Sequence, residues 1–415
     1  MDNNKRVKYA CYTSSMSMSV VICLSPLLFL TFKETYNISF TLLGLLVAVN
    51  FLTQLAIDLL FSFFSHKFNI PLAVKLTPIL TCIGLLIYAL VPLLFPTHAV
   101  VGIFIGTIIF AVSGGLGEVL MSPVIAALPS KNPEREMSKL HSMYAWGVVG
   151  VIAFSSLFLY LVGYHNWHYL ALVLGVIPLV SACLFISSTI PKMETPEKVS
   201  GVLKLMKNKE LWLCFFAIFL GGAAENVMSQ WCSGYLEASL GIPKILGDIF
   251  GLALFALFLG IGRTLYSRIG KNISKVLLWG AVGATVCYLV ASLTPIPVLG
   301  LIACALTGFF TSMLWPGSLI VGQERIPEGG VFMFAMMASG GDLGSAIAPQ
   351  LVGSITDAIT LSNFGINLAS SLGISPEQLG MKAGMLLGMI FPLIAIFVYL
   401  TIIKKYKKDN LLHNP

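Results

Sequence analysis

Three acidic residues lie near the middle of long apolar stretches, where a charged side chain is costly in lipid. They are Glu118, Glu225 and Asp342. Intramembrane carboxylates usually face a cavity or an ion pathway, and burial disfavours their charged form. The sequence predicts no lysine or arginine at the same depth, and the nearest is Arg263. We therefore expect the three acids to bind and release protons, the structural alternative being a protonated acid hydrogen-bonded between helices.

A polar stripe precedes these acids in the chain. Asn50, Gln54 and Asp58 are spaced i, i+4 and i+8, which places them on one helical face over roughly 12 Å. Such a stripe faces either a cavity or the polar groups of a neighbouring helix. We expect Asp58 and Arg263 to form gating contacts near one membrane surface, with interhelical hydrogen bonding as the alternative.

Aromatic and amide side chains at similar depth form a candidate substrate site. Sugar sites often combine a flat apolar ring with hydrogen-bonding groups, although aromatic residues also fill helix interfaces and interfacial belts. The aromatic candidates are Tyr144, Trp146, Trp231 and Trp315. The polar candidates are Asn50, Gln54, Asn226 and Gln230, together with Glu118 and Glu225.

The elements that must position these residues are membrane-spanning helices. The chain has 415 residues, of which 57% are hydrophobic and 10% charged, whereas charged residues make up about a quarter of a soluble domain. Apolar runs of about 20 residues, each long enough to span the bilayer, recur along the chain. The predicted fold is an all-α membrane protein with twelve spans: 10–31, 40–64, 72–94, 99–128, 138–163, 167–189, 211–237, 246–268, 273–293, 296–324, 331–359 and 380–404.

The polar, lysine-rich segment between the sixth and seventh spans divides the chain into two halves. We expect six-helix bundles at 1–190 and 211–415, joined by a cytoplasmic linker at 191–210, and a second long polar loop from Thr360 to Gly380. Aligning Pro123 with Pro316 superimposes GGLGEVLMSP on TGFFTSMLWP. This indicates parallel repeats, an arrangement in which substrate sites lie near mid-membrane between the halves. Glu118 then falls opposite Thr311, so the acid is an asymmetric addition to a shared scaffold.

The basic residues predict orientation and account for the net charge of +7. With the N-terminus inside, nearly all of them fall in cytoplasmic connections and tails, and the exceptions are Lys33, Lys244 and Lys382. This distribution follows the positive-inside rule, so no nucleic-acid partner is needed to explain the charge. We expect a monomer in the bacterial cytoplasmic membrane, with lipids around it and both termini in the cytoplasm.

The sequence gives no support for enzymatic chemistry or for a bound cofactor. The eight cysteines are scattered singly and form no metal-ligand spacing. No nucleophile–base pair and no phosphate-binding loop with its lysine is visible. Anion carriers need Arg or Lys to recognise their cargo, so the expected lack of deep basic residues favours a neutral or cationic substrate.

Four stretches carry a resemblance to a known family. They are GLGEVLMSP, ending at Pro123; LHSMYAWGVVG from Leu140 to Gly150; IGRTLYSRIGKNISKVL from Ile261 to Leu277; and SMLWP together with GGDLGSAIAPQLVGSITD, ending at Asp357. Over nearly its whole length the chain resembles the major facilitator superfamily, and locally it resembles the fucose–proton symporters. The resemblance implies a rocker-switch symporter in which Glu118 matches a carboxylate used for substrate and proton coupling. It also shows two departures, since the first span has no acid and the loop at 65–69 lacks the superfamily's usual aspartate and glycine.

We therefore expect a secondary transporter that works by alternating access and couples uptake of a neutral sugar or similar hydroxylated solute to protons. An acidic, aromatic cavity would serve proton-coupled efflux of a cationic or amphipathic compound equally well. A substrate sensor that retains the fold is a further alternative, although the short loops and the lack of an appended signalling domain count against it.

Overall fold

The computed structural model describes residues 2–64, 67–130, 133–191, 206–269, 272–326 and 330–413, and this part of the chain is helical without β-strands. Eleven helical segments are long and apolar enough to cross a membrane. The remaining predicted span, 331–359, lies within the 32-residue helix α16, Gly330–Leu361. The prediction of an all-α, twelve-span fold is confirmed.

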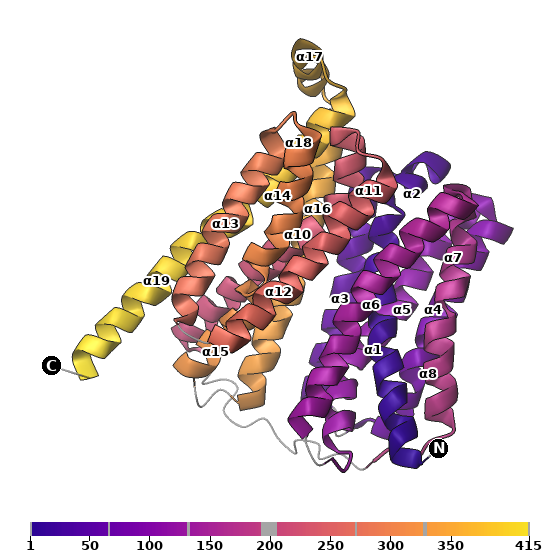
Figure 1. Ribbon diagram of the computed structural model, residues 1–415, viewed down its shortest axis with the longest axis vertical. Helices are drawn as coiled ribbons and strands as arrows, with labels where there is room; N and C mark the ends of the chain where they lie inside the picture. Colours follow the sequence, from indigo (N-terminus) through magenta and orange to yellow (C-terminus); the bar gives the residue numbers. More distant parts are fainter. Residues whose placement is uncertain are drawn as a thin grey trace. The chain divides into compact units, whose positions relative to one another are not determined.

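The chain forms two compact units, and the first contains residues 1–38 and 49–200. Its helices run side by side in Figure 1. They are α1 (Asn3–Leu27), α2 (Phe29–Tyr36), most of α3 (Phe40–Phe64), α4 (Ile70–Leu94), α5 (Ala99–Ala126), α6 (Pro133–Val162), α7 (Trp167–Leu174) and α8 (Val176–Ile186), with short 3₁₀ turns η2 (Pro96–His98) and η3 (Tyr164–Asn166).

The second unit contains residues 39–48 and 201–415. Besides the start of α3 and α16, its elements are α10 (Lys209–Leu240), α11 (Lys244–Leu246), the π-helix η4 (Gly247–Ala253), α12 (Leu254–Ile269), α13 (Ile273–Leu293), α14 (Pro297–Thr311), α15 (Leu314–Arg325), α17 (Asn363–Leu372), α18 (Pro376–Gly388) and α19 (Ile390–His413). The expectation of a polar loop from Thr360 to Gly380 is wrong, because α17 and the start of α18 occupy it. Ser362 and Ser375 cap these two helices by accepting hydrogen bonds from backbone amides.

Glycines set the spacing between the most closely packed helices of the first unit. A Cβ atom built on Gly84 of α4 would lie 2.6 Å from the backbone nitrogen of Phe110 on α5. A Cβ on Gly106 of α5 would lie 2.7 Å from the backbone of α4. Only glycine fits at both places, which is the small-residue packing expected of membrane helices.

Residues 39–48, at the start of α3, are grouped with the second unit by their contacts. Asp357 of α16 accepts hydrogen bonds from the backbone nitrogens of Phe40 and Thr41, at 3.2 and 2.6 Å. A carboxylate there satisfies unpaired N–H groups and stabilises the positive end of the helix. The predicted division at 191–210 stays a prediction, since most of that linker lies outside the described residues.

Candidate functional site

Glu118 is an exposed carboxylate on an otherwise well-packed part of α5. The exposed apolar side chains of this helix, among them Val101, Ile105 and Ile108, repeat every three or four residues and form one stripe. Glu118 lies about a third of a turn from that stripe. Gly114 and Ala111, one and two turns earlier on the same side, are buried. The exposure of Glu118 is therefore local and distinct from the apolar surface that faces lipid.

The polar stripe of α3 packs against the glycines that precede Glu118. Gln54 donates a hydrogen bond from Nε2 to Oδ1 of Asn50 over 3.2 Å, and both side chains are buried. A Cβ on Gly114 would lie 2.9 Å from Oε1 of Gln54. A Cβ on Gly115 would lie 3.1 Å from Oδ1 of Asp58. The glycines at the start of the segment 114–117 thus leave room for the polar face of α3. Where the two helices meet, the stripe serves interhelical packing.

Glu225 of α10 forms an ion pair with Arg263 of α12. The Nη2 atom of Arg263 lies 3.3 and 3.2 Å from the two carboxylate oxygens. Glu225 is largely enclosed, with 17% of its side chain exposed, whereas Arg263 is 41% exposed. The expectation that the deep acids lack a cationic partner is therefore wrong at Glu225. Arg263 therefore pairs with Glu225, an acid of its own unit. The gating role expected for Asp58 and Arg263 stays a prediction.

Pro316 explains why Arg263 is held where it is. The predicted tenth span breaks between α14 and α15, at Ser312 and Met313. Proline has no N–H, so residue 316 cannot donate to the carbonyl of Ser312 four residues earlier. Arg263 supplies the missing donor, with its Nε atom 3.0 Å from that carbonyl oxygen. The aligned proline of the first half, Pro123, lies in the unbroken helix α5.

Trp315 packs against α16 and against α10, about one turn before Glu225. A Cβ on Gly341 of α16 would lie 2.4 Å from its ring, and one on Gly222 of α10 would lie 3.0 Å away. One turn after Gly222, Asn226 donates hydrogen bonds to the carbonyl of Gly222 and to Oγ of Ser345, at 3.2 and 2.8 Å. The structure therefore groups Glu225, Asn226, Arg263 and Trp315 in one region of the second unit. Ser312 and Ser345 were not identified from the sequence.

Two other predicted binding residues are part of the packed interior. Trp231 is 1% exposed; its Nε1 atom donates to the carbonyl of Pro349 over 3.0 Å, and its ring lies 6.0 Å from that of Phe40. Gln230 is also buried. In this structure neither side chain has a surface open to a substrate.

Tyr144 and Trp146 lie on α6. The backbone carbonyl of Tyr144 accepts a hydrogen bond from Ser19 of α1. Trp146 is 66% exposed and begins a stripe of exposed residues at alternating spacings of four and three, with Gly150, Ala153, Leu157 and Tyr160. That continuous exposed stripe along a spanning helix favours contact with lipid for Trp146.

Asp342, the third predicted proton-coupling acid, is buried on α16. Within the described residues, no group of three or more His, Cys, Asp or Glu side chains could hold a metal ion.

A buried ion pair that the sequence did not suggest lies at the start of the eighth span. Lys244 was expected in an outer loop, but its side chain is 6% exposed and its Nζ atom lies 3.2 Å from Asp248. Ser233 of α10 bonds to both residues. Asp248 lies in the first turn of the π-helix η4, and π-helical turns often mark functional sites. The i, i+4 spacing of Lys244 and Asp248 was the available sequence signal.

Comparison with known proteins relates this arrangement to a transporter family. The Major Facilitator Superfamily description matches residues 10–349. No curated protein matches the chain in sequence. Among solved structures, the nucleoside transporter NupG is similar with a TM-score of 0.72 and 14% identity, over 97% of this chain and 100% of that one.

Two proton symporters have the same architecture. A D-xylose–proton symporter matches with a TM-score of 0.68 and 13% identity, over 94% of this chain and 97% of that one. A variant of the Escherichia coli fucose–proton symporter FucP matches with a TM-score of 0.57 and 14% identity, covering 95% and 99% of the two chains. At these identities the likeness shows the fold alone.

Proposed function

Because this chain belongs to the Major Facilitator Superfamily of membrane transporters, we propose that it takes up a neutral sugar or similar small hydroxylated solute together with protons. It would work by alternating access in the bacterial cytoplasmic membrane, as a monomer with both termini inside. Secondary transporters of this kind commonly place substrate and coupling-ion sites near mid-membrane.

The observation that carries the proposal is the exposed carboxylate of Glu118. It lies away from the apolar stripe of α5 and is preceded by buried residues on its own side of the helix. An intramembrane acid in such a place most often contacts water or a transported species. In this proposal Glu118 exchanges a proton with the transport pathway and accepts a hydrogen bond from a substrate hydroxyl.

The cluster around Glu225 supports a neutral substrate. Arg263 brings one positive charge to Glu225, and the contact between them balances both charges. The cluster therefore has no net charge to attract an anion. With the carboxylate, the guanidinium, the amide of Asn226 and the ring of Trp315, it has the donors, acceptors and flat apolar surface that suit a hydroxylated ring.

Proteoliposomes with an imposed inward proton gradient test this proposal. Counterflow of a labelled panel of hexoses, pentoses, polyols and nucleosides identifies a cargo. Adding that solute to the medium should then cause external alkalinisation that saturates with its concentration. Saturable uptake without proton movement would contradict proton coupling.

The same carboxylate would also attract a cation, which keeps efflux as a second candidate. In that case the panel of neutral solutes gives no counterflow. Cells that produce the protein then accumulate less of a lipophilic cation than cells that produce the Glu118→Gln variant. These two results together would replace uptake with proton-coupled efflux.

A further inference from the structure

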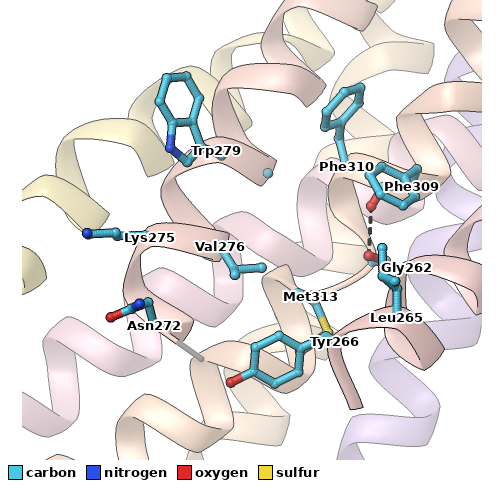
Figure 2. A pocket seen from close by; sticks show the side chains of 12 residues that line it. Gly262, Leu265, Tyr266, Asn272, Lys275, Val276, Trp279, Phe309, Phe310 and Met313 are labelled. Atoms are coloured by element: carbon cyan, nitrogen blue, oxygen red, sulfur yellow. Dashed lines mark hydrogen bonds between the residues drawn. The ribbon is translucent and has the colours of Figure 1, made fainter. Parts of the chain in front are cut away.

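A mainly apolar pocket of about 330 Å³ lies in the second unit between α12, α13 and the break that follows α14. Figure 2 shows Val276 and Trp279 on one wall, with Leu265, Phe309, Phe310 and Met313 around the rest. None of the residues that line the pocket is acidic. The pocket is separate from the Glu225 cluster, although Ser312 borders both.

The pocket opens on an exposed, largely apolar surface of the second unit. Leu257, Ile261 and Leu265 are exposed at four-residue intervals along the spanning helix α12. Trp279 on α13 is 68% exposed. Exposed apolar side chains on a spanning helix contact acyl chains, so the natural occupant of a hollow among them is a hydrocarbon chain rather than a soluble solute.

One end of the pocket is polar and basic. Asn272, Lys275, Val276 and Trp279 are spaced i, i+3, i+4 and i+7, so they follow one face of α13 from its start. Asn272 and Lys275 are exposed. The short connection before α13 is among those that the basic residues place on the cytoplasmic side, where the leaflet carries anionic lipids. A lysine one turn from a lipid-facing tryptophan is the arrangement that holds a head group above its acyl chain.

We propose that this pocket binds an anionic phospholipid of the cytoplasmic leaflet. Its phosphate lies at Lys275 and Asn272, and one acyl chain lies along Trp279 and Phe310. Ser312 connects this site with the ion pair: its hydroxyl donates to the carbonyl of Phe309, the contact drawn in Figure 2, and its carbonyl accepts from Arg263. A bound chain therefore rests on the segment that positions Arg263. The inference does not depend on which substrate is transported.

Native mass spectrometry of the full, delipidated chain in detergent tests the proposal by titration with phosphatidylglycerol. We expect one site of higher affinity, with phosphatidylcholine binding at least severalfold more weakly. Lys275→Gln should weaken phosphatidylglycerol binding about fivefold, the effect of one basic group near the membrane surface. Lys404→Gln, an equal charge change at an exposed position of α19, should leave it unaltered. Equal binding of the two lipids, or equal loss in the two variants, overturns the proposal.

The acyl-chain half of the proposal has its own test. Val276→Trp fills the pocket and should abolish the high-affinity site, whereas glycerol phosphate without acyl chains should not bind to the wild-type chain. A second measurement does not require a variant that fills the pocket. Phosphatidylglycerol with brominated chains, in excess phosphatidylcholine, should quench a component of tryptophan fluorescence that Trp279→Phe lacks. Quenching that is the same in wild type and Trp279→Phe places the lipid elsewhere and overturns the assignment.

Discussion

Arg263 joins two features that are far apart in the sequence: its Nη2 atom contacts the carboxylate of Glu225 at 3.2 Å, and its Nε atom donates to the carbonyl of Ser312 at 3.0 Å. One planar guanidinium can make both contacts because its donors point in fixed, divergent directions. The ion pair and the break between α14 and α15 are therefore mechanically connected through a single side chain.

A double-mutant cycle should show this connection. We expect Glu225→Gln and Arg263→Met each to destabilise the protein by about 1–2 kcal/mol, because each leaves the other charge partly enclosed without its partner. The double variant should be no less stable than either single variant, giving a clear coupling energy. Thermal unfolding in detergent measures this, with Arg268→Met, an exposed arginine on the same helix, as the control. Additive effects would contradict a direct pair.

Pro316→Ala tests the origin of the break. The new N–H can donate to the carbonyl of Ser312 and compete with Arg263, while removal of proline from a helix favours stability by up to about 3 kcal/mol. We expect a protein at least as stable as wild type with a transport rate reduced about tenfold. Pro297→Ala, the same change in the first turn of α14, is the matched control. A wild-type transport rate in Pro316→Ala would show that the carbonyl of Ser312, left without an intrahelical donor by the proline, has no role in transport.

Gly115→Val tests the close approach of α5 to the polar stripe. The new Cβ would lie 2.9 Å from the backbone oxygen of Gln54, so the helices must separate. We expect a loss of about 1–3 kcal/mol, the usual cost of overpacking. At Gly150 nothing lies within 4 Å of the added atom, so Gly150→Val carries the same propensity cost without the clash. Equal destabilisation of the two variants would argue against tight packing at Gly115.

Glu136, which precedes the membrane-spanning part of α6, should stabilise the folded protein in a pH-dependent way. The hydroxyl of Tyr12 donates to it over 2.6 Å and Lys8 lies 3.1 Å away, and these contacts lower the pKa of Glu136 to about 2. A carboxyl whose pKa is lower in the folded state stabilises fully above its unfolded value and loses that stabilisation as the pH falls toward the folded value. Glu136→Gln should therefore lower the unfolding temperature at pH 7, and the difference should shrink from about pH 4.5 downward. A difference independent of pH would contradict this account.

The spans and their number could be predicted from the sequence because hydropathy acts locally along the chain, whereas the roles of Glu118, Glu225 and Asp342 stay predictions. The loss of the intrahelical donor to the carbonyl of Ser312 could also be predicted, because proline four residues later has no N–H. The break itself could not be predicted, since Pro123 causes the same loss in the unbroken helix α5. The helix α17 was missed because its polar residues resemble a loop, and the cap at Ser362 was not recognised.

The pairing of Glu225 with Arg263 could not be predicted from depth along the helices. Sequence position locates the Cα atom of an arginine, whereas its long side chain carries the guanidinium several ångströms away. The burial of Trp231 depends on Pro349 and Phe40, both of which are far from it in the chain. Exposure of an aromatic side chain is set by such tertiary contacts, which periodicity within one helix does not reveal.

If Glu118 couples solute movement to protons, its neutral variant should separate the two in proteoliposomes. For Glu118→Gln we predict that accumulation driven by a proton gradient falls to the level of empty liposomes, while counterflow exchange of the same solute persists. Glu34→Gln, which removes an exposed acid near the end of α2, should accumulate the solute as wild type does. Proton-driven accumulation by Glu118→Gln at the wild-type level would show that Glu118 does not couple transport to protons.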